Sequence, residues 1–88
     1  MTRAEIIKTV DAFLIEEFEV DPDEIILEEN FHETLDLDSL DYVDLVVAIQ
    51  NSFGFKLTAD DFQGVDTFQQ FYDMIEQHYH KHIGENAN

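Results

Sequence analysis

Ser39 is the residue of this chain whose position could support covalent chemistry. It follows Asp38, a residue type that favours the N-cap of a helix, and it precedes a segment with helical apolar spacing. The dipole at a helix start favours a bound anion, although Asp38 and Asp41 oppose one here. No His or Lys lies beside Ser39 in the sequence to activate its hydroxyl. We therefore interpret Ser39 as a site that another enzyme modifies, and we predict that the chain is not an enzyme.

Four aspartates, Asp36, Asp38, Asp41 and Asp44, form an acidic cluster around this serine. Asp41 and Asp44 are three residues apart, so they share one face of the predicted helix. The cluster has two interpretations. It is either a solvated helix face or a docking surface for basic partner proteins. We favour docking because the cluster adjoins Ser39.

Metal binding finds little support in the sequence. An EF-hand calcium loop would need a carboxylate or amide where Leu40 stands and a glycine where Asp41 stands, so that pattern fails. His78, His80 and His82 alternate near the C-terminus, and only the first and last of them would share a helix face. We interpret these histidines as a frayed polar tail and predict no metal site.

Apolar periodicity and capping signals predict three longer helices and one short one. Thr2 with Glu5, and Thr67 with Gln70, have the spacing of a capping box. Gly54 is typical of a helix end. The expected helices cover residues 3–18, 39–53, 59–63 and 68–82.

The segment over residues 25–37 is predicted to be a long ordered loop that follows a turn at Pro22. Its first residues could begin a strand, but no second strand is available to pair with them. We expect Ile25, Phe31 and Leu35 to pin this loop to the core. Loops of this length are unusual unless they have a function.

These elements predict an all-α fold, a small antiparallel bundle of three longer helices and one short helix, with a long loop between the first and second helices. Residues 1–83 are expected to form one domain and residues 84–88 a polar tail. In the first helix, Asp11 is predicted to face away from the core. In the helix over residues 39–53, the residues predicted to face the core are Leu40, Val43, Val46, Val47 and Phe53, flanked by Leu45 and Ile49.

Charge is the strongest compositional signal. The 88 residues include 21 Asp and Glu against 4 Lys and Arg, a formal net charge of −17 at pH 7. Such a surface repels nucleic acid and anionic lipid and attracts basic proteins. There is no cysteine, no apolar run of about 20 residues and no signal-peptide pattern. We expect a cytoplasmic monomer that binds basic proteins, and neither nucleic acid nor the membrane interior.

The segment around Ser39 resembles the acyl carrier protein family, whose Asp-Ser-Leu attachment motif reads here Asp38-Ser39-Leu40. The similarity covers roughly residues 3–80. It includes an aromatic residue before the motif, apolar positions around it, and the entry to the last helix. These residues are Phe31, Leu35, Leu37, Leu40, Val43, Leu45, Val46, Val65, Thr67 and Phe68. The resemblance implies that Ser39 carries 4′-phosphopantetheine, with Asp38 and Leu40 completing the motif.

The resemblance also implies a function without catalysis. Because the chain has no cysteine, the thiol that holds an acyl group as a thioester would come from the prosthetic arm. The implied partners are a phosphopantetheinyl transferase and acyl synthases and transferases of fatty-acid, polyketide or related biosynthesis. Their basic surfaces would dock on Asp36, Asp41 and Asp44, and the helices would part to shelter the acyl chain. The alternative is an unmodified acidic helical module that acts by binding alone.

Asp36 departs from the family pattern, in which glycine is common two residues before the motif aspartate. Glycine there allows unusual backbone angles, and Asp is among the few other residues that tolerate the left-handed region. We therefore expect the fold to accommodate Asp36. The position lies close to where the modifying enzyme docks, so the substitution bears on transferase preference. Thr34 likewise replaces a common acidic residue, and both changes suggest a specialised carrier.

Overall fold

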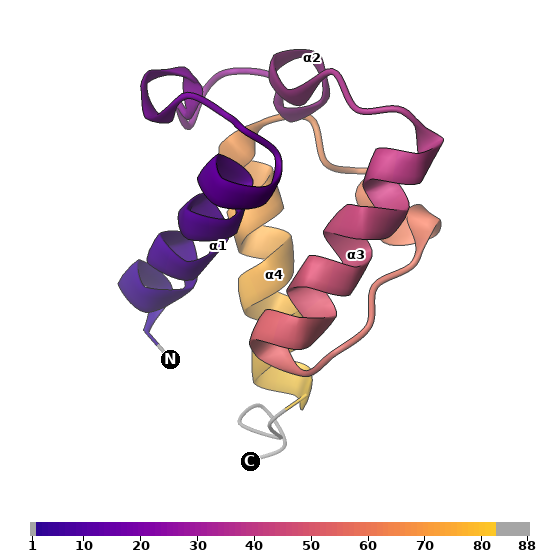
Figure 1. Cartoon of the computed structure of the whole chain (residues 1–88). Helices are drawn as coiled ribbons and strands as arrows, with labels where there is room; N and C mark the ends of the chain where they lie inside the picture. The colour runs from indigo at the N-terminus through magenta and orange to yellow at the C-terminus, as the bar shows by residue number, and fades with distance from the viewer. Residues whose placement is uncertain (1, 83–88) are drawn as a thin grey trace.

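The computed structural model describes residues 2–82, apart from the side chain of Ala59. Three long helices form the bundle, α1 (Arg3–Glu17), α3 (Ser39–Phe53) and α4 (Phe68–His82). Helix α1 contacts both α3 and α4, and α4 lies between the other two in the view of Figure 1. The all-α fold class is confirmed, and the predicted bounds of the long helices are correct to within one residue. The tail expected over residues 84–88 lies outside the described residues.

Three short elements connect the long helices: η1 (Pro22–Glu24), α2 (Phe31–Leu35) and η2 (Ala59–Phe62). The 3-10 turn η1 begins at the predicted turn, and η2 occupies most of the predicted short helix. Helix α2 lies in the segment predicted to be loop throughout, so that prediction is wrong for these residues. Asn30 caps α2 by accepting the Glu33 N–H at 2.8 Å, which stabilises a single helical turn here.

The connection around α2 is anchored to the start of α4. The Phe31 N–H donates to the Asp66 carbonyl oxygen at 2.7 Å. The Phe31 ring is fully buried and stacks on Phe71, with ring centroids 4.2 Å apart. Ile25 and Leu35 are partly buried against the same core. The prediction that these three apolar residues pin the segment is confirmed.

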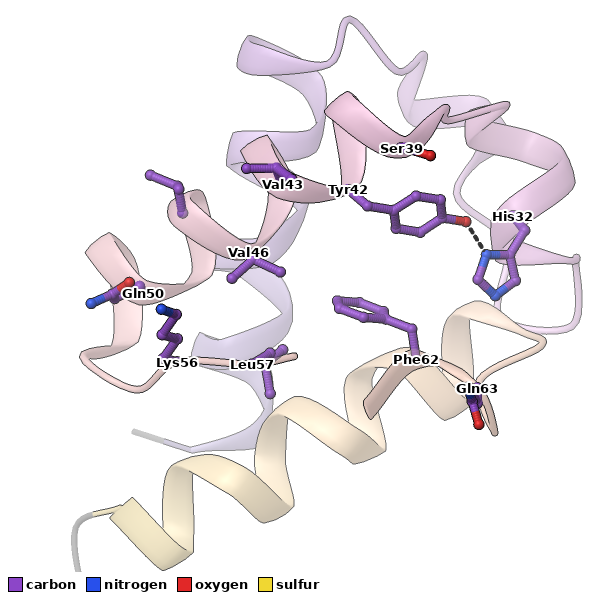
Figure 2. A pocket seen from close by; sticks show the side chains of 11 residues that line it. His32, Ser39, Tyr42, Val43, Val46, Gln50, Lys56, Leu57, Phe62 and Gln63 are labelled. Carbon is purple, nitrogen blue, oxygen red and sulfur yellow. Dashed lines mark hydrogen bonds between the residues drawn. The ribbon is translucent and has the colours of Figure 1, made fainter. Parts of the chain in front are cut away.

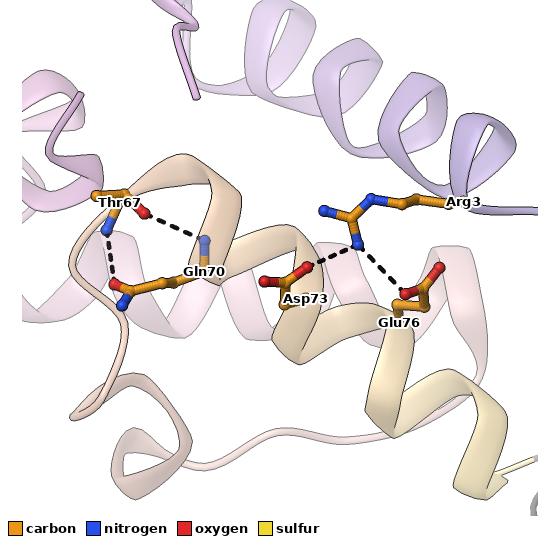
Figure 3. Close-up of polar contacts among 5 residues, drawn as sticks. All are labelled: Arg3, Thr67, Gln70, Asp73 and Glu76. Carbon is orange, nitrogen blue, oxygen red and sulfur yellow. Dashed lines mark hydrogen bonds and ion pairs between the residues drawn. The ribbon is translucent and has the colours of Figure 1, made fainter. Parts of the chain in front are cut away.

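The helix ends agree with the capping signals in the sequence. Thr2 Oγ1 accepts the Glu5 N–H at 3.2 Å, and Glu5 Oε1 accepts the Thr2 N–H at 2.9 Å. Thr67 and Gln70 form the same reciprocal pair at the start of α4, at 3.2 and 3.1 Å (Figure 3). Gly54 ends α3 with a φ of 86°, which an L-residue rarely adopts. Short-range hydrogen bonds therefore set the bounds of the long helices.

One arginine links the first turn of α1 to α4. Arg3 Nη1 lies 2.7 Å from Asp73 Oδ1 and 3.2 Å from Glu76 Oε1 (Figure 3). All three side chains are partly exposed, so this ion pair contributes little to stability on its own. The charge of Arg3 is therefore already neutralised by acidic neighbours.

The face of α3 that meets the core differs from the predicted one. The buried residues of this helix are Leu45, Ala48, Ile49 and Phe53. Leu40, Val43 and Val47 have exposed fractions of 75%, 59% and 48%, so their assignment to the core is wrong. Val46 is half-buried. Because α3 carries apolar residues on two faces, helical periodicity alone cannot tell which face meets the bundle.

The prediction that Asp11 faces away from the core is wrong, because its side chain packs against α4. Its carboxylate accepts a hydrogen bond from the Tyr72 hydroxyl. Burial raises the pKa of Asp11, and the hydrogen bond from Tyr72 opposes this shift in part. Burial and the neighbouring carboxylate also raise the pKa of Tyr72 far above its usual value, so the phenol keeps its proton. The charge of Asp11 therefore costs stability at neutral pH.

We expect Asp11→Asn to raise the melting temperature at pH 7 by a few degrees. The amide oxygen can still accept from Tyr72, while the cost of burying a charge disappears. The folded-state pKa of Asp11 lies above its unfolded value, so the wild type is penalised only as pH rises through these values. The gain should therefore vanish as pH falls below the usual Asp pKa. Thermal unfolding from pH 3 to pH 8 measures it.

Glu16→Gln is the matched control, because Glu16 is exposed on the same helix and loses the same charge. An equal gain in both variants would show that net charge, rather than burial of Asp11, causes the effect.

Candidate functional site

Ser39 is the first residue of α3, and its side chain is exposed. Asp38 is the N-cap, as predicted, and its Oδ1 accepts the N–H groups of Leu40 and Asp41, both at 3.0 Å. Asp41 Oδ2 accepts the Asp38 N–H at 3.2 Å, which completes a capping box. Two of the donors that open the helix are thus already paired. A phosphate on Ser39 would gain from the helix dipole rather than from these N–H groups.

Asp36 sets the direction of the chain into this helix start. It ends α2 in the left-handed region, with φ 49° and ψ 50°, and its N–H donates to the His32 carbonyl oxygen at 2.9 Å. Asp36 thus adopts the left-handed backbone that aspartate is expected to tolerate. Leu37 follows and packs partly against the core. This anchored turn delivers Asp38 and Ser39 to the surface.

The acidic cluster is not uniform in its surroundings. Asp36, Asp38 and Asp44 are exposed, whereas Asp41 is half-buried beside the backbone that it caps. Asp41 therefore has a structural role that the sequence analysis missed. The signal was present, because an acidic residue three positions after an N-cap is the second half of a capping box. The exposed members remain available to a partner.

A histidine that the sequence analysis did not select holds the first turns of α3 in place. His32 Nε2 lies 2.6 Å from the Val65 carbonyl oxygen, and Nδ1 is hydrogen-bonded to the Tyr42 hydroxyl (Figure 2). Because a carbonyl oxygen only accepts, Nε2 donates to Val65, which leaves Nδ1 to share the hydrogen bond with the Tyr42 hydroxyl. Burial raises the pKa of Tyr42, which keeps its hydroxyl a donor. His32 thus links α2, α3 and the segment before α4.

His32 and Ser39 line the same pocket, although they are separated in the sequence. Both ring nitrogens of His32 are already engaged by Tyr42 and Val65. This histidine is therefore placed to orient Tyr42, and not to take a proton from Ser39. Ser39 is exposed, and His32 is not placed to activate its hydroxyl.

A pocket of about 740 Å³ opens beside Ser39 and extends along α3 (Figure 2). Its opposite wall comes from the segment over residues 56–63. The apolar part of the lining consists mainly of Val43, Val46, Val47, Leu57 and Phe62. Two of the valines wrongly assigned to the core are thus wall residues of this pocket. Its size and lining suit a ligand with an extended apolar part.

The histidines near the end of α4 belong to the helix, which continues through His82, and so they do not form a frayed tail. His78 stacks on Phe55 with ring centroids 5.8 Å apart, and its Nε2 lies 3.5 Å from Asp61 Oδ1. Across residues 2–82, no three His, Cys, Asp or Glu side chains are grouped so that they could hold a metal ion. Within the same residues, no helix has the length and apolar character needed to cross a membrane.

Comparison with known proteins gives consistent matches. A family model described as a phosphopantetheine attachment site matches residues 8–75. The chain is 33% identical to the acyl carrier protein of Thermosynechococcus vestitus, over 85% of this chain and 93% of the relative. It is 33% identical to the acyl carrier protein of Lactobacillus johnsonii, over 89% and 98%. It is 36% identical to acyl carrier protein 2 of Ralstonia nicotianae, over 76% and 83%.

The helical fold, the exposed serine at a helix start and the family match define a class of protein, that of phosphopantetheine-dependent carriers. The chain belongs to the acyl carrier protein family. It is a carrier of acyl groups and not an enzyme, its cofactor is 4′-phosphopantetheine, and it works with biosynthetic enzymes and a phosphopantetheinyl transferase. The predicted family, carrier role and cofactor are confirmed.

Proposed function

We propose that Ser39 is the residue that carries 4′-phosphopantetheine and that the arm presents acyl thioesters to fatty-acid or related biosynthetic enzymes. The observation that carries this assignment is an exposed Ser39 at the Asp38-capped start of α3, beside an apolar pocket. The position lies within the matched residues 8–75. Ser52, the other serine, lies in the last turn of α3 and is half-buried.

The neighbours of Ser39 in the motif have distinct parts in this proposal. Asp38 holds the first turn of α3 and so fixes where the serine hydroxyl is presented. Leu40 has an exposed fraction of 75% and offers an apolar contact beside the modified residue. Because His32 is already engaged, the base that removes the Ser39 proton belongs to the transferase.

The pocket supplies a place for the carried group. The arm begins at Ser39 and is flexible, so it can fold back along α3. The acyl chain then lies against Val43, Val46, Leu57 and Phe62. Removing apolar carbon atoms from water stabilises this arrangement, and it limits the access of water to the thioester.

Partner recognition in this proposal rests on the exposed acidic cluster. Asp36, Asp38 and Asp44 lie within a few residues of Ser39, on a chain of net charge −17. They are placed to attract the basic rims of a transferase or synthase, while Asp41 mainly caps α3. We also propose that the protein is a monomer in the cytoplasm. A chain without cysteine is compatible with that reducing compartment.

Intact-mass measurement tests the proposal. Incubation with coenzyme A and a broad-range phosphopantetheinyl transferase should add the mass of one phosphopantetheinyl group to nearly every molecule. The reason is that the chain presents one exposed serine within the attachment motif. Circular dichroism of the same sample verifies that the chain is folded. An unchanged mass in folded protein would favour the unmodified interaction module.

A further inference from the structure

The end of the pocket remote from Ser39 is polar. Gln50 of α3 and Lys56 of the following segment line this end, whereas valine, leucine and phenylalanine line the middle (Figure 2). Ser39 and Gln50 are about 16 Å apart along the axis of α3, at a rise of about 1.5 Å per residue. The pocket therefore has an attachment point near one end, an apolar middle, and an amide with an ammonium group at the other end.

Lys56 stands out in so acidic a chain. It is one of only 4 Lys and Arg residues, against 21 Asp and Glu, and it is the one that lines this pocket. Like Lys8 and Lys81, it forms no ion pair among residues 2–82. Arg3, in contrast, is paired with two acids of α4. The side chain of Gln50 likewise has no hydrogen-bond partner within residues 2–82. Both side chains thus keep donors free at the pocket end.

We propose that the pocket accepts an acyl chain whose far end is a carboxylate, held by Lys56 and Gln50. This inference rests on the proposed attachment at Ser39. The methylene groups would lie on the Val43 and Val46 wall, and the carboxylate would receive charge-assisted hydrogen bonds from the Lys56 ammonium. Gln50 adds an amide donor.

Charge makes Lys56 decisive for such a ligand. Gln50 and Lys56 are exposed, so a carboxylate at this end stays hydrated, but the surrounding net charge of −17 would repel it. Lys56 offsets this repulsion at the point where the chain ends. A chain that ends in a methyl group gains nothing from an ammonium group. The two kinds of acyl group should therefore respond differently to removal of this one charge.

The test compares two acyl groups of eight carbons each, octanoyl, which ends in a methyl group, and octanedioyl, which ends in a carboxylate. The phosphopantetheinyl transferase loads each group, together with the arm, from its coenzyme A thioester. Methyl chemical shifts of Val43, Val46 and Leu57 report how far each chain occupies the pocket. In wild type, the octanedioyl chain should shift these methyls. In Lys56→Met, its occupancy should fall by threefold or more, while octanoyl occupancy stays unchanged.

Lys8→Met is the control, because Lys8 is exposed on α1 and its loss lowers the positive charge equally. It should leave the occupancy of both chains as in wild type. Equal octanedioyl occupancy in wild type and Lys56→Met would overturn the inference, and so would absent methyl shifts in protein whose mass shows full loading. A chain that takes no arm at all is recognised by mass and overturns the proposed function together with this inference.

Discussion

Ser39→Ala should abolish phosphopantetheinylation completely while leaving the folded structure intact. The hydroxyl oxygen is the only atom of this residue to which a phosphodiester can be attached. Within residues 2–82 it forms no hydrogen bond, and Asp38 rather than Ser39 caps the helix. Alanine is also favourable in the first turn of a helix. We therefore expect the free energy of unfolding to change by no more than about 0.5 kcal/mol, as at ordinary surface positions.

The measurement is intact mass after incubation with coenzyme A and the transferase, with thermal unfolding on the same preparations. Ser52→Ala is the matched control, since it removes the other serine and should be labelled like wild type. A labelled Ser39→Ala protein would refute the assignment of the site. Loss of labelling in Ser52→Ala, in protein that still folds, would refute it equally.

The long helices could be predicted because the signals that bound them are local. The capping pairs at Thr2 and Thr67 and the glycine after α3 act within a few residues of each helix end. Helix α2 could not be predicted in this way, because its five residues are too few to show a helical period or to be stable alone. Its stability depends on partners far along the chain, such as the bond from Phe31 N–H to the Asp66 carbonyl oxygen.

The local geometry of the proposed attachment site was largely predictable from the sequence, and its surroundings were not. The N-cap role of Asp38 follows from its residue type. The left-handed backbone of Asp36 follows from the glycine common at this position in the resembled family, which Asp can replace. The pocket depends on which apolar face of α3 meets the bundle, and the sequence carries two such faces. Lys56 and Phe62 reach the pocket only through the return of the chain after Gly54.

Asp41 shows why the surface charges have to be treated separately. Its spacing from Asp44 suggested a pair of equivalent exposed acids, but Asp41 accepts the backbone N–H of Asp38. Replacement of Asp41 would therefore weaken the start of α3, by about 1 kcal/mol for a typical cap, and would confound a test of docking. Asp36 and Asp44 form no side-chain hydrogen bond or ion pair within residues 2–82, so they are the better choices.

Asp36→Asn combined with Asp44→Lys should slow modification of Ser39 by roughly tenfold at low ionic strength, because charge complementarity acts mainly on the rate of association. Asparagine at position 36 removes the charge while tolerating the left-handed backbone there, which lysine would strain. The difference should shrink as salt is raised, since charges beyond the Debye length are screened, about 10 Å at 0.1 M. The measurement is the initial rate of mass increase across a salt series, on protein shown to be folded.

Glu16→Gln combined with Glu17→Lys is the matched control. Both residues are exposed on α1, and the double variant changes the net charge by the same amount as the docking variant. If the general field of the protein steers the transferase, the two double variants should slow equally. If the exposed acids beside Ser39 make the contact, only Asp36→Asn with Asp44→Lys should be slow at low salt. Rates equal to wild type in both variants would leave the acidic cluster as a solvated helix face.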